Sequence, residues 1–238
     1  MSSFPVDAAE ILQRLGSGDS RIQRAAAEEC ARRASTDPTI RPKLVAALGS
    51  ADAPLRWGAA YALSRLGPAF DEADDAFVEY LGSEVSDVRW TATEILSDPI
   101  VLRRVAERMR NLIANGTPVQ RRMALYCLRN ECVNSAQFDA SIDRALDDQD
   151  HNVRLAAMSC LARITRRKPE AAERLSERLF DENAAVRRAA AAHLGKLEVA
   201  TSQILSSLES LRDHPDVSLR RAVHQALTRL RDRTSRSR

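Results

Sequence analysis

Histidine and cysteine are the residue types best suited to holding a metal or moving a proton, but their spacing in this sequence fits neither use. The histidines form no His-Glu-x-x-His pattern, and the cysteines form no Cys-x-x-Cys pair. A glycine-rich phosphate loop and a Gly-x-Ser-x-Gly turn are also missing. We therefore expect no metal and no cofactor, and these patterns favour a non-catalytic protein over an enzyme without deciding between them. The residues concerned are His151, His193, His214, His224, Cys30, Cys127, Cys132 and Cys160.

Glu94 is the carboxylate that best fits acid chemistry, because it lies one helical turn after Trp90. A catalytic role for Glu94 stays open at this point. The other concentration of carboxylates, the run 71–75, opens a helical pattern. Carboxylates are favoured at the start of a helix, so we interpret this run as a solvated helix start.

Composition and charge exclude several classes of protein. The chain has 238 residues, 44% of them hydrophobic and only 4% aromatic, and it contains no apolar stretch of membrane-spanning length. Its net charge is +3, but the last ten residues alone carry +4. The first sixteen residues do not resemble a secretory signal. Four cysteines within or beside helical patterns indicate reduced thiols, and so a cytoplasmic protein.

One sequence unit recurs through nearly the whole chain. It consists of an apolar residue, an arginine, an alanine three positions later and a leucine four positions after that, as in Val153, Arg154, Ala157 and Leu161. The units start at 22, 55, 88, 120, 153, 186 and 219, so the step is 33 residues five times and 32 residues once. Such a period indicates stacked repeats that bury a continuous core.

Each unit is predicted to be a helix, a short polar turn and a second helix. A short polar residue precedes most starts by three positions and is a candidate N-cap. These residues are Asp19, Asp52, Thr117, Asp150, Asn183 and Asp216, with Val85 as the exception. The first helices are expected at 7–15, 39–48, 71–81, 101–114, 136–146, 170–179 and 199–211.

The unit Asp–x–x–apolar–Arg–x–x–Ala–x–x–x–Leu, as at Asp150 to Leu161, resembles the HEAT-like repeats, in particular the short subclass of phycobilisome lyases. The resemblance covers about residues 6–232. It implies an all-α, right-handed α-solenoid, or superhelix, of about seven helix pairs. We accordingly expect a single repeat domain at 1–232, followed by a basic, flexible C-terminal tail at 233–238.

The resemblance leaves several functions open, because this fold carries scaffolds, lyases, hydroxylases and glycosylases. HEAT-like diiron hydroxylases depend on repeated His-Glu pairs, which this sequence lacks. HEAT-like alkylpurine DNA glycosylases place a carboxylate and tryptophans on a basic concave face, which keeps a nucleic-acid-binding or glycosylase-like protein as one alternative. The lyase subclass keeps a bilin lyase or lyase-like chaperone as another.

The recurring arginine is predicted to be structural. Because it occupies the same place in every unit, it is expected to pair with an aspartate near the turn and form a ladder between units. The predicted ladder consists of Arg56, Arg89, Arg121, Arg154, Arg187 and Arg220 with Asp19, Asp52, Asp150 and Asp216.

The residues that vary along the second helices are predicted to form the binding surface. They lie two, six and ten positions after each start, so they share one helix face, and we call them the binding stripe. Both tryptophans and two of the three tyrosines lie on it, with nine basic and three acidic residues. The candidate partner-binding residues are Trp57, Tyr61, Arg65, Trp90, Glu94, Arg122, Tyr126, Arg24, Arg188 and Arg221.

Aromatic residues and arginine dominate binding hot spots. We therefore predict a non-catalytic scaffold or adaptor that binds an acidic or aromatic-containing segment of a protein partner along this basic concave face. Nucleic acid is the less favoured partner, no membrane is expected, and the sequence does not indicate an oligomeric state.

Overall fold

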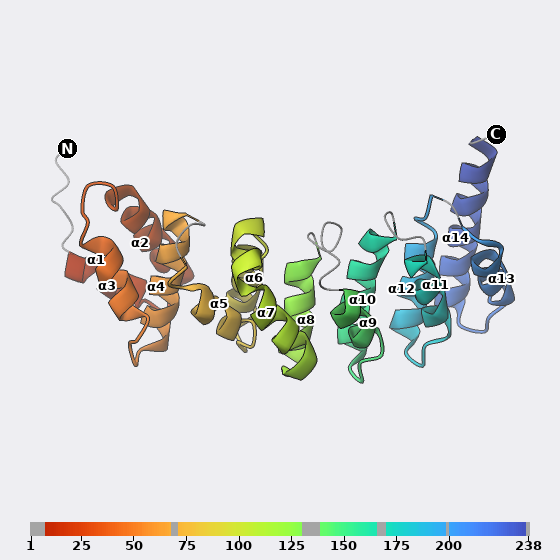
Figure 1. The fold of residues 1–238 in the computed structure, drawn as a ribbon, viewed down its shortest axis with the longest axis horizontal. Coiled ribbons are helices and arrows are strands. Elements are labelled where there is room, and N and C mark those ends of the chain that lie inside the picture. The colour runs from red at the N-terminus through yellow and green to blue at the C-terminus, as the bar shows by residue number, and fades with distance from the viewer. Residues whose placement is uncertain (1–7, 68–70, 130–138, 166–169, 199, 237–238) are drawn as a thin grey trace. The chain divides into compact units, whose positions relative to one another are not determined.

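The computed structural model describes residues 8–67, 71–129, 139–165, 170–198 and 200–236 (Figure 1). These residues form fourteen α-helices and one short 3-10 helix, with no strand among them. The all-α prediction is therefore confirmed. The α-helices are α1 (Ala8–Leu15), α2 (Ser20–Arg33), α3 (Ile40–Ala47), α4 (Ala53–Leu66), α5 (Asp74–Tyr80), α6 (Ser86–Leu96), α7 (Pro99–Asn115), α8 (Pro118–Leu128), α9 (Asp139–Leu146), α10 (His151–Ile164), α11 (Ala171–Glu177), α12 (Ala184–Leu194), α13 (Ser202–Ser210) and α14 (Val217–Arg236).

The chain divides into two compact units, Met1–Arg108 and Met109–Arg238. The first unit contains α1 to α6 and the start of α7, and the second contains the rest of α7 and α8 to α14. Within the first unit α2 packs along α4, and within the second α8 packs along α10 and α12 along α14. The single domain expected at 1–232 stays a prediction.

The repeated alanines and leucines form the core. All seven residues at the alanine position are fully buried, because a small side chain lets neighbouring helices approach closely. The leucine position is buried in every unit as well. The alanine-position residues are Ala26, Ala59, Ala92, Ala124, Ala157, Ala190 and Val223.

The predicted caps occupy the N-cap positions of the second helices. Asp150, for example, accepts a hydrogen bond from the backbone N–H of Asn152 at 2.7 Å, and Thr117 forms a reciprocal capping box with Gln120. Asp52 takes the N-cap position without a side-chain capping bond. The backbone N–H groups of Leu219 and Ser218 stabilise the charged form of Asp216 and hold the pKa of that carboxyl below its usual value.

The C-terminal helix is longer than expected. The sequence predicted a flexible tail from residue 233, but α14 continues to Arg236. The Arg233 guanidinium donates a hydrogen bond to the Leu197 carbonyl, which ties the end of α14 to the segment after α12. Residues 237 and 238 lie outside the described part of the chain.

Candidate binding surface

The recurring arginine hydrogen-bonds to the backbone of the turn in its own repeat. In Arg56, Arg154, Arg187 and Arg220 the Nη1 atom donates to a backbone carbonyl six residues earlier, at 2.6 to 2.8 Å. Arg121 does the same to the Gly116 carbonyl at 2.7 Å. The first repeat has Gln23 in place of the arginine, and its buried amide donates to the carbonyls of Leu15 and Pro54. The arginine row therefore has a structural role in these turns.

Two of these arginines also bind an aspartate of the next repeat. Arg121 binds Asp148 through two hydrogen bonds of 2.7 and 2.8 Å, and Arg154 binds Asp181 through two of 3.0 and 2.8 Å. A planar guanidinium on a carboxylate fixes geometry as well as charge. These pairs form an arginine–aspartate ladder within the second unit.

The aspartates of this ladder differ from the predicted ones. Asp148 and Asp181 lie two residues before the cap, where the first three repeats have a serine and the last has His214. Asp19, Asp150 and Asp216 instead accept hydrogen bonds from backbone N–H groups at the start of their own helices. A capping carboxylate faces along its own helix axis, so these three are not the ladder partners in the described structure.

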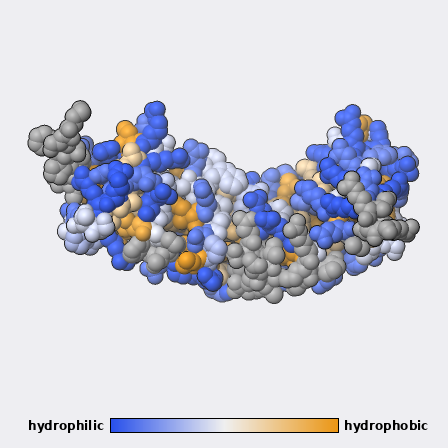
Figure 2. All heavy atoms as spheres, turned by 90° about the horizontal axis from the view of Figure 1, so that it is seen from above, coloured by the Kyte–Doolittle hydropathy of each residue, from blue (hydrophilic) through white to orange (hydrophobic). Residues whose placement is uncertain are grey.

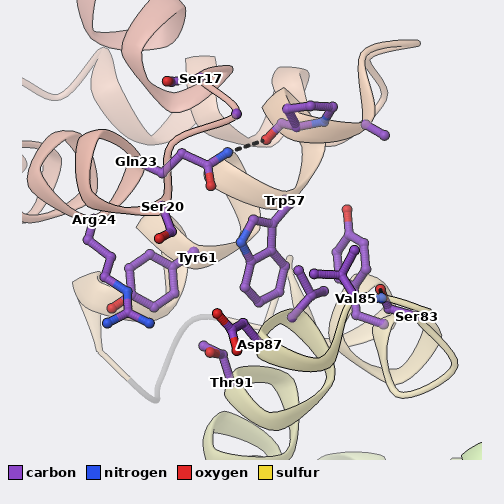
Figure 3. Close-up of a pocket in the computed structure, with 15 residues that line it drawn as sticks. Ser17, Ser20, Gln23, Arg24, Trp57, Tyr61, Ser83, Val85, Asp87 and Thr91 are labelled. Atoms are coloured by element: carbon purple, nitrogen blue, oxygen red, sulfur yellow. Dashed lines mark hydrogen bonds between the residues drawn. The ribbon is translucent and has the colours of Figure 1, made fainter.

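A pocket of about 430 Å³ lies between α2, α4 and α6 in the first unit (Figure 3). It forms where α4 and α6 approach each other less closely than α2 and α4 do. Three of the predicted binding residues, Arg24, Trp57 and Tyr61, line it. Ligand sites are typically concave and mostly apolar with a few polar groups, and this pocket has that character.

Trp57 is the centre of an aromatic cluster. Its ring stacks on Tyr61 at 6.1 Å between centroids, and it meets Tyr80 and Phe77 edge to face at 5.0 and 6.0 Å. Tyr80 and Phe77 belong to α5, and Phe77 is fully buried. Trp57 thus combines packing between the second and third repeats with a half-buried face in the pocket.

A second pocket, of about 330 Å³, adjoins the first along the binding stripe. Arg24 and Tyr61 line both pockets, and Arg65 and Glu94 line the second. Arg65 pairs with Glu28 at 2.9 Å, and the buried Asp74 in this pocket is held by Arg104 at 2.7 Å. Glu94 is exposed at its edge.

Trp90 and the stripe residues of the second unit do not line either of these two pockets. Trp90 is 51% exposed on α6, although it takes the same repeat position as Trp57. In the second unit Arg122 and Tyr126 are half-buried on α8, Arg188 lies 3.7 Å from Asp216, and Arg221 is exposed on α14.

The charge of the binding stripe is divided unevenly between the units. In the first unit it carries three arginines and three carboxylates, whereas in the second unit it carries six basic residues and no acidic one. Figure 2 shows hydrophilic side chains gathered over the helices near the C-terminus, and apolar patches among hydrophilic side chains over the first unit. The basic residues of the second unit are Arg122, Arg163, Arg188, Lys196, Arg221 and Arg229.

Sequence reasoning missed several residues of the first pocket. Tyr80 comes from a first helix, and burial raises the pKa of its hydroxyl. Ser83, Val85 and Asp87 come from the turn and first residues of α6. Val85 gave a signal, because it is the one N-cap position of the seven without a short polar side chain, and it is 59% exposed.

The predicted chemistry-bearing residues are dispersed. Cys30, Cys127 and Cys160 are buried, and burial raises the pKa of Cys30 to about 11. Cys132 lies outside the described residues. The described residues contain no group of three or more potential metal ligands. In the same part of the chain, no helix has the length and apolarity needed to cross a membrane.

The succession of helix pairs, and the arginine that hydrogen-bonds to the turn in repeat after repeat, define a helical repeat protein. The HEAT repeat family model matches residues 8–97, 106–194 and 138–228, so the chain belongs to the HEAT repeat family. The resemblance inferred from the sequence is thereby confirmed. No protein with a curated description matches the chain significantly.

Several solved structures are similar to the chain. An engineered protein is 20% identical with a TM-score of 0.49, and the match covers 94% of this chain and 68% of the other. The complex of CpcE and CpcF of phycocyanin lyase from Nostoc sp. PCC7120 is 20% identical with a TM-score of 0.42, covering 97% and 99%. A designed armadillo repeat protein in complex with peptide (KR)4 is 16% identical with a TM-score of 0.42, covering 94% and 99%.

Proposed function

We propose that this protein is a non-catalytic adaptor that binds a segment of a partner protein along the binding stripe. The observation that carries the proposal is the pocket at Trp57 and Tyr61. Beyond the packing of Trp57 on Phe77 and Tyr80, the Trp57 and Tyr61 rings both line this open pocket. Aromatic side chains that line an open pocket are the usual anchors of a protein interface.

The two parts of the stripe suit different parts of a partner. The first unit offers the aromatic pocket with charges of both signs, and the second offers six basic residues without an acidic one. A basic row attracts an acidic stretch and accelerates association, while the pocket fixes which segment binds.

Affinity purification with matched variants tests this proposal. The stripe variant is Arg24→Glu with Tyr61→Ala, and the control is Val45→Ser, an exposed position on α3 outside the stripe. A protein partner should be retained by the wild type and by the control variant but lost by the stripe variant. Retention of every bound protein by a folded stripe variant would refute the proposal.

The basic row of the second unit favours nucleic acid as a second candidate partner. Binding through this row should weaken steeply as salt increases, because each phosphate contact releases counterions. A titration of labelled single- and double-stranded DNA at several salt concentrations distinguishes the two candidates. Absence of binding at moderate salt would eliminate this second candidate and leave the adaptor.

A further inference from the structure

The first pocket has one charge of each sign at its edge, and neither charge is neutralised by the described residues. Arg24 on α2 and Asp87 in the first turn of α6 are both exposed. No ion pair or hydrogen bond joins either side chain to another described residue. Glu28, one turn after Arg24 on α2, behaves differently, since it pairs with Arg65 on α4.

Both charges lie beside aromatic side chains of the pocket. In Figure 3 Arg24 lies on the Tyr61 side of the pocket, and Asp87 lies beside the Trp57 ring with Thr91 next to it. Tyr80, Val85 and Val88 complete the apolar lining. The Trp57 indole N–H has no acceptor among the described residues, so it is available to a carbonyl of a bound chain.

We propose that this pocket takes one apolar side chain of a partner segment that has an acidic residue on one side of it and a basic residue on the other. This inference rests on the proposed adaptor function and narrows the partner from an acidic segment to one of mixed charge at this position. The acidic residue faces Arg24, and the basic residue faces Asp87.

Charge complementarity and the size of the pocket both support this kind of partner segment. A segment with two acidic flanks would bring one carboxylate against Asp87, and a segment with two basic flanks would bring a cation against Arg24. Like charges brought together at an interface disfavour the wrong partner. A pocket of about 430 Å³ is at the small end of the range for ligand sites, which suits one large side chain and its adjoining backbone.

Trp57 fluorescence in the full chain measures this binding. The variant Trp90→Phe leaves Trp57 as the only tryptophan. The probes are four synthetic glycine–serine peptides with a central leucine flanked by Glu then Lys, Lys then Glu, two Glu or two Lys, and a fifth with alanine in place of leucine. One mixed-charge peptide should bind at least about tenfold tighter than both same-charge peptides, and the alanine peptide should not bind.

A charge exchange supplies the decisive comparison. In Arg24→Glu with Asp87→Lys, both exposed, the preferred order of Glu and Lys should reverse while the fold is retained. An unchanged order, equal binding of the same-charge peptides, or no leucine-dependent response would overturn the inference. The affinity purification above is independent, so a stripe-dependent partner combined with any of these results would refute the charge pattern alone.

Discussion

Arg154 donates two hydrogen bonds to the carboxylate of Asp181 in the next repeat. Both side chains are almost fully buried, at 6% and 5% exposure. Arg154 also holds the carbonyl of Asp148 at 2.7 Å. One guanidinium therefore fastens the turn of its own repeat and the turn of its neighbour. The hydrogen bond to the turn carbonyl recurs in the other arginines of the row, whereas the pair with an aspartate of the next repeat is also made by Arg121.

Removing the carboxylate of this pair should destabilise the second unit. In Asp181→Ala the buried guanidinium loses its partner, which costs about 3 kcal/mol of unfolding free energy. Urea denaturation followed by circular dichroism measures this, because both tryptophans lie in the first unit. The matched control is Glu182→Ala, whose carboxylate contacts the same arginine but is 83% exposed, and it should cost less than about 1 kcal/mol.

A further arginine–aspartate pair in the ladder should stabilise the protein. Arg187 has a buried Nε atom without a hydrogen-bond partner among the described residues, and His214 takes the place where the preceding turns have Asp148 and Asp181. His214→Asp should supply the missing acceptor and raise the unfolding free energy by about 1 kcal/mol. Asp can also replace the Nδ1 atom that accepts the Asp216 N–H. A lower stability than that of His214→Ala would show that Arg187 cannot reach this position.

The two tryptophans should respond differently to truncation. Trp57→Ala removes the ring that contacts Phe77 and Tyr80, so it should cost about 2–3 kcal/mol. Trp90→Ala removes a ring that is 51% exposed and should cost less than about 1 kcal/mol. Denaturation curves of both variants check this. Equal losses would contradict the different packing of the two rings.

Gly58 should not tolerate a side chain. A Cβ atom there would lie 2.2 Å from the Leu15 carbonyl oxygen, so Gly58→Ala would push α4 away from the end of α1. We expect a loss of about 1–3 kcal/mol. Gly18→Ala is the control, because nothing lies within 4 Å of its Cβ position. A stable Gly58→Ala variant would mean that α1 and α4 can separate at little cost.

His193 should make stability depend on mildly acidic pH. Burial, with a smaller contribution from Lys196, lowers its pKa from the ordinary value of 6.5. Below that value the unfolded chain takes up a proton that the folded chain does not, so the unfolding free energy should decrease as pH falls from 6.5. The decrease between pH 6.5 and 5 should be smaller in His193→Gln, whereas exposed His224→Gln should follow the wild type.

The repeat scaffold could be predicted from the sequence because each repeat places the same kinds of buried residue at the same positions. The alanine and leucine rows, the caps and the second helices all follow from local spacing. The aspartates of the ladder were missed because Asp148 and Asp181 resemble the adjacent caps in type and lie only two residues away. Their role depends on which way each carboxylate points, and spacing does not determine that direction.

The pocket could be predicted only in part. Trp57 and Tyr61 stood out as rings on an otherwise polar face, but Trp57 and Trp90 are equivalent in the repeat and differ in the structure. Trp57 meets Phe77 and Tyr80 from a neighbouring first helix, whereas Trp90 is 51% exposed. Contacts between elements of different repeats, and the spacing of α4 and α6 that opens the pocket, are tertiary properties that repeat periodicity does not encode.

Site-specific photo-cross-linking tests whether a partner protein binds at the aromatic pocket. A photoreactive amino acid in place of Thr91, which lines both pockets, should cross-link the partner recovered by affinity purification. The same group in place of the exposed Val45 on α3 should not. Cross-linking at position 45 but not at position 91 would contradict the account, because the partner would then bind the first helices rather than the aromatic pocket of the binding stripe.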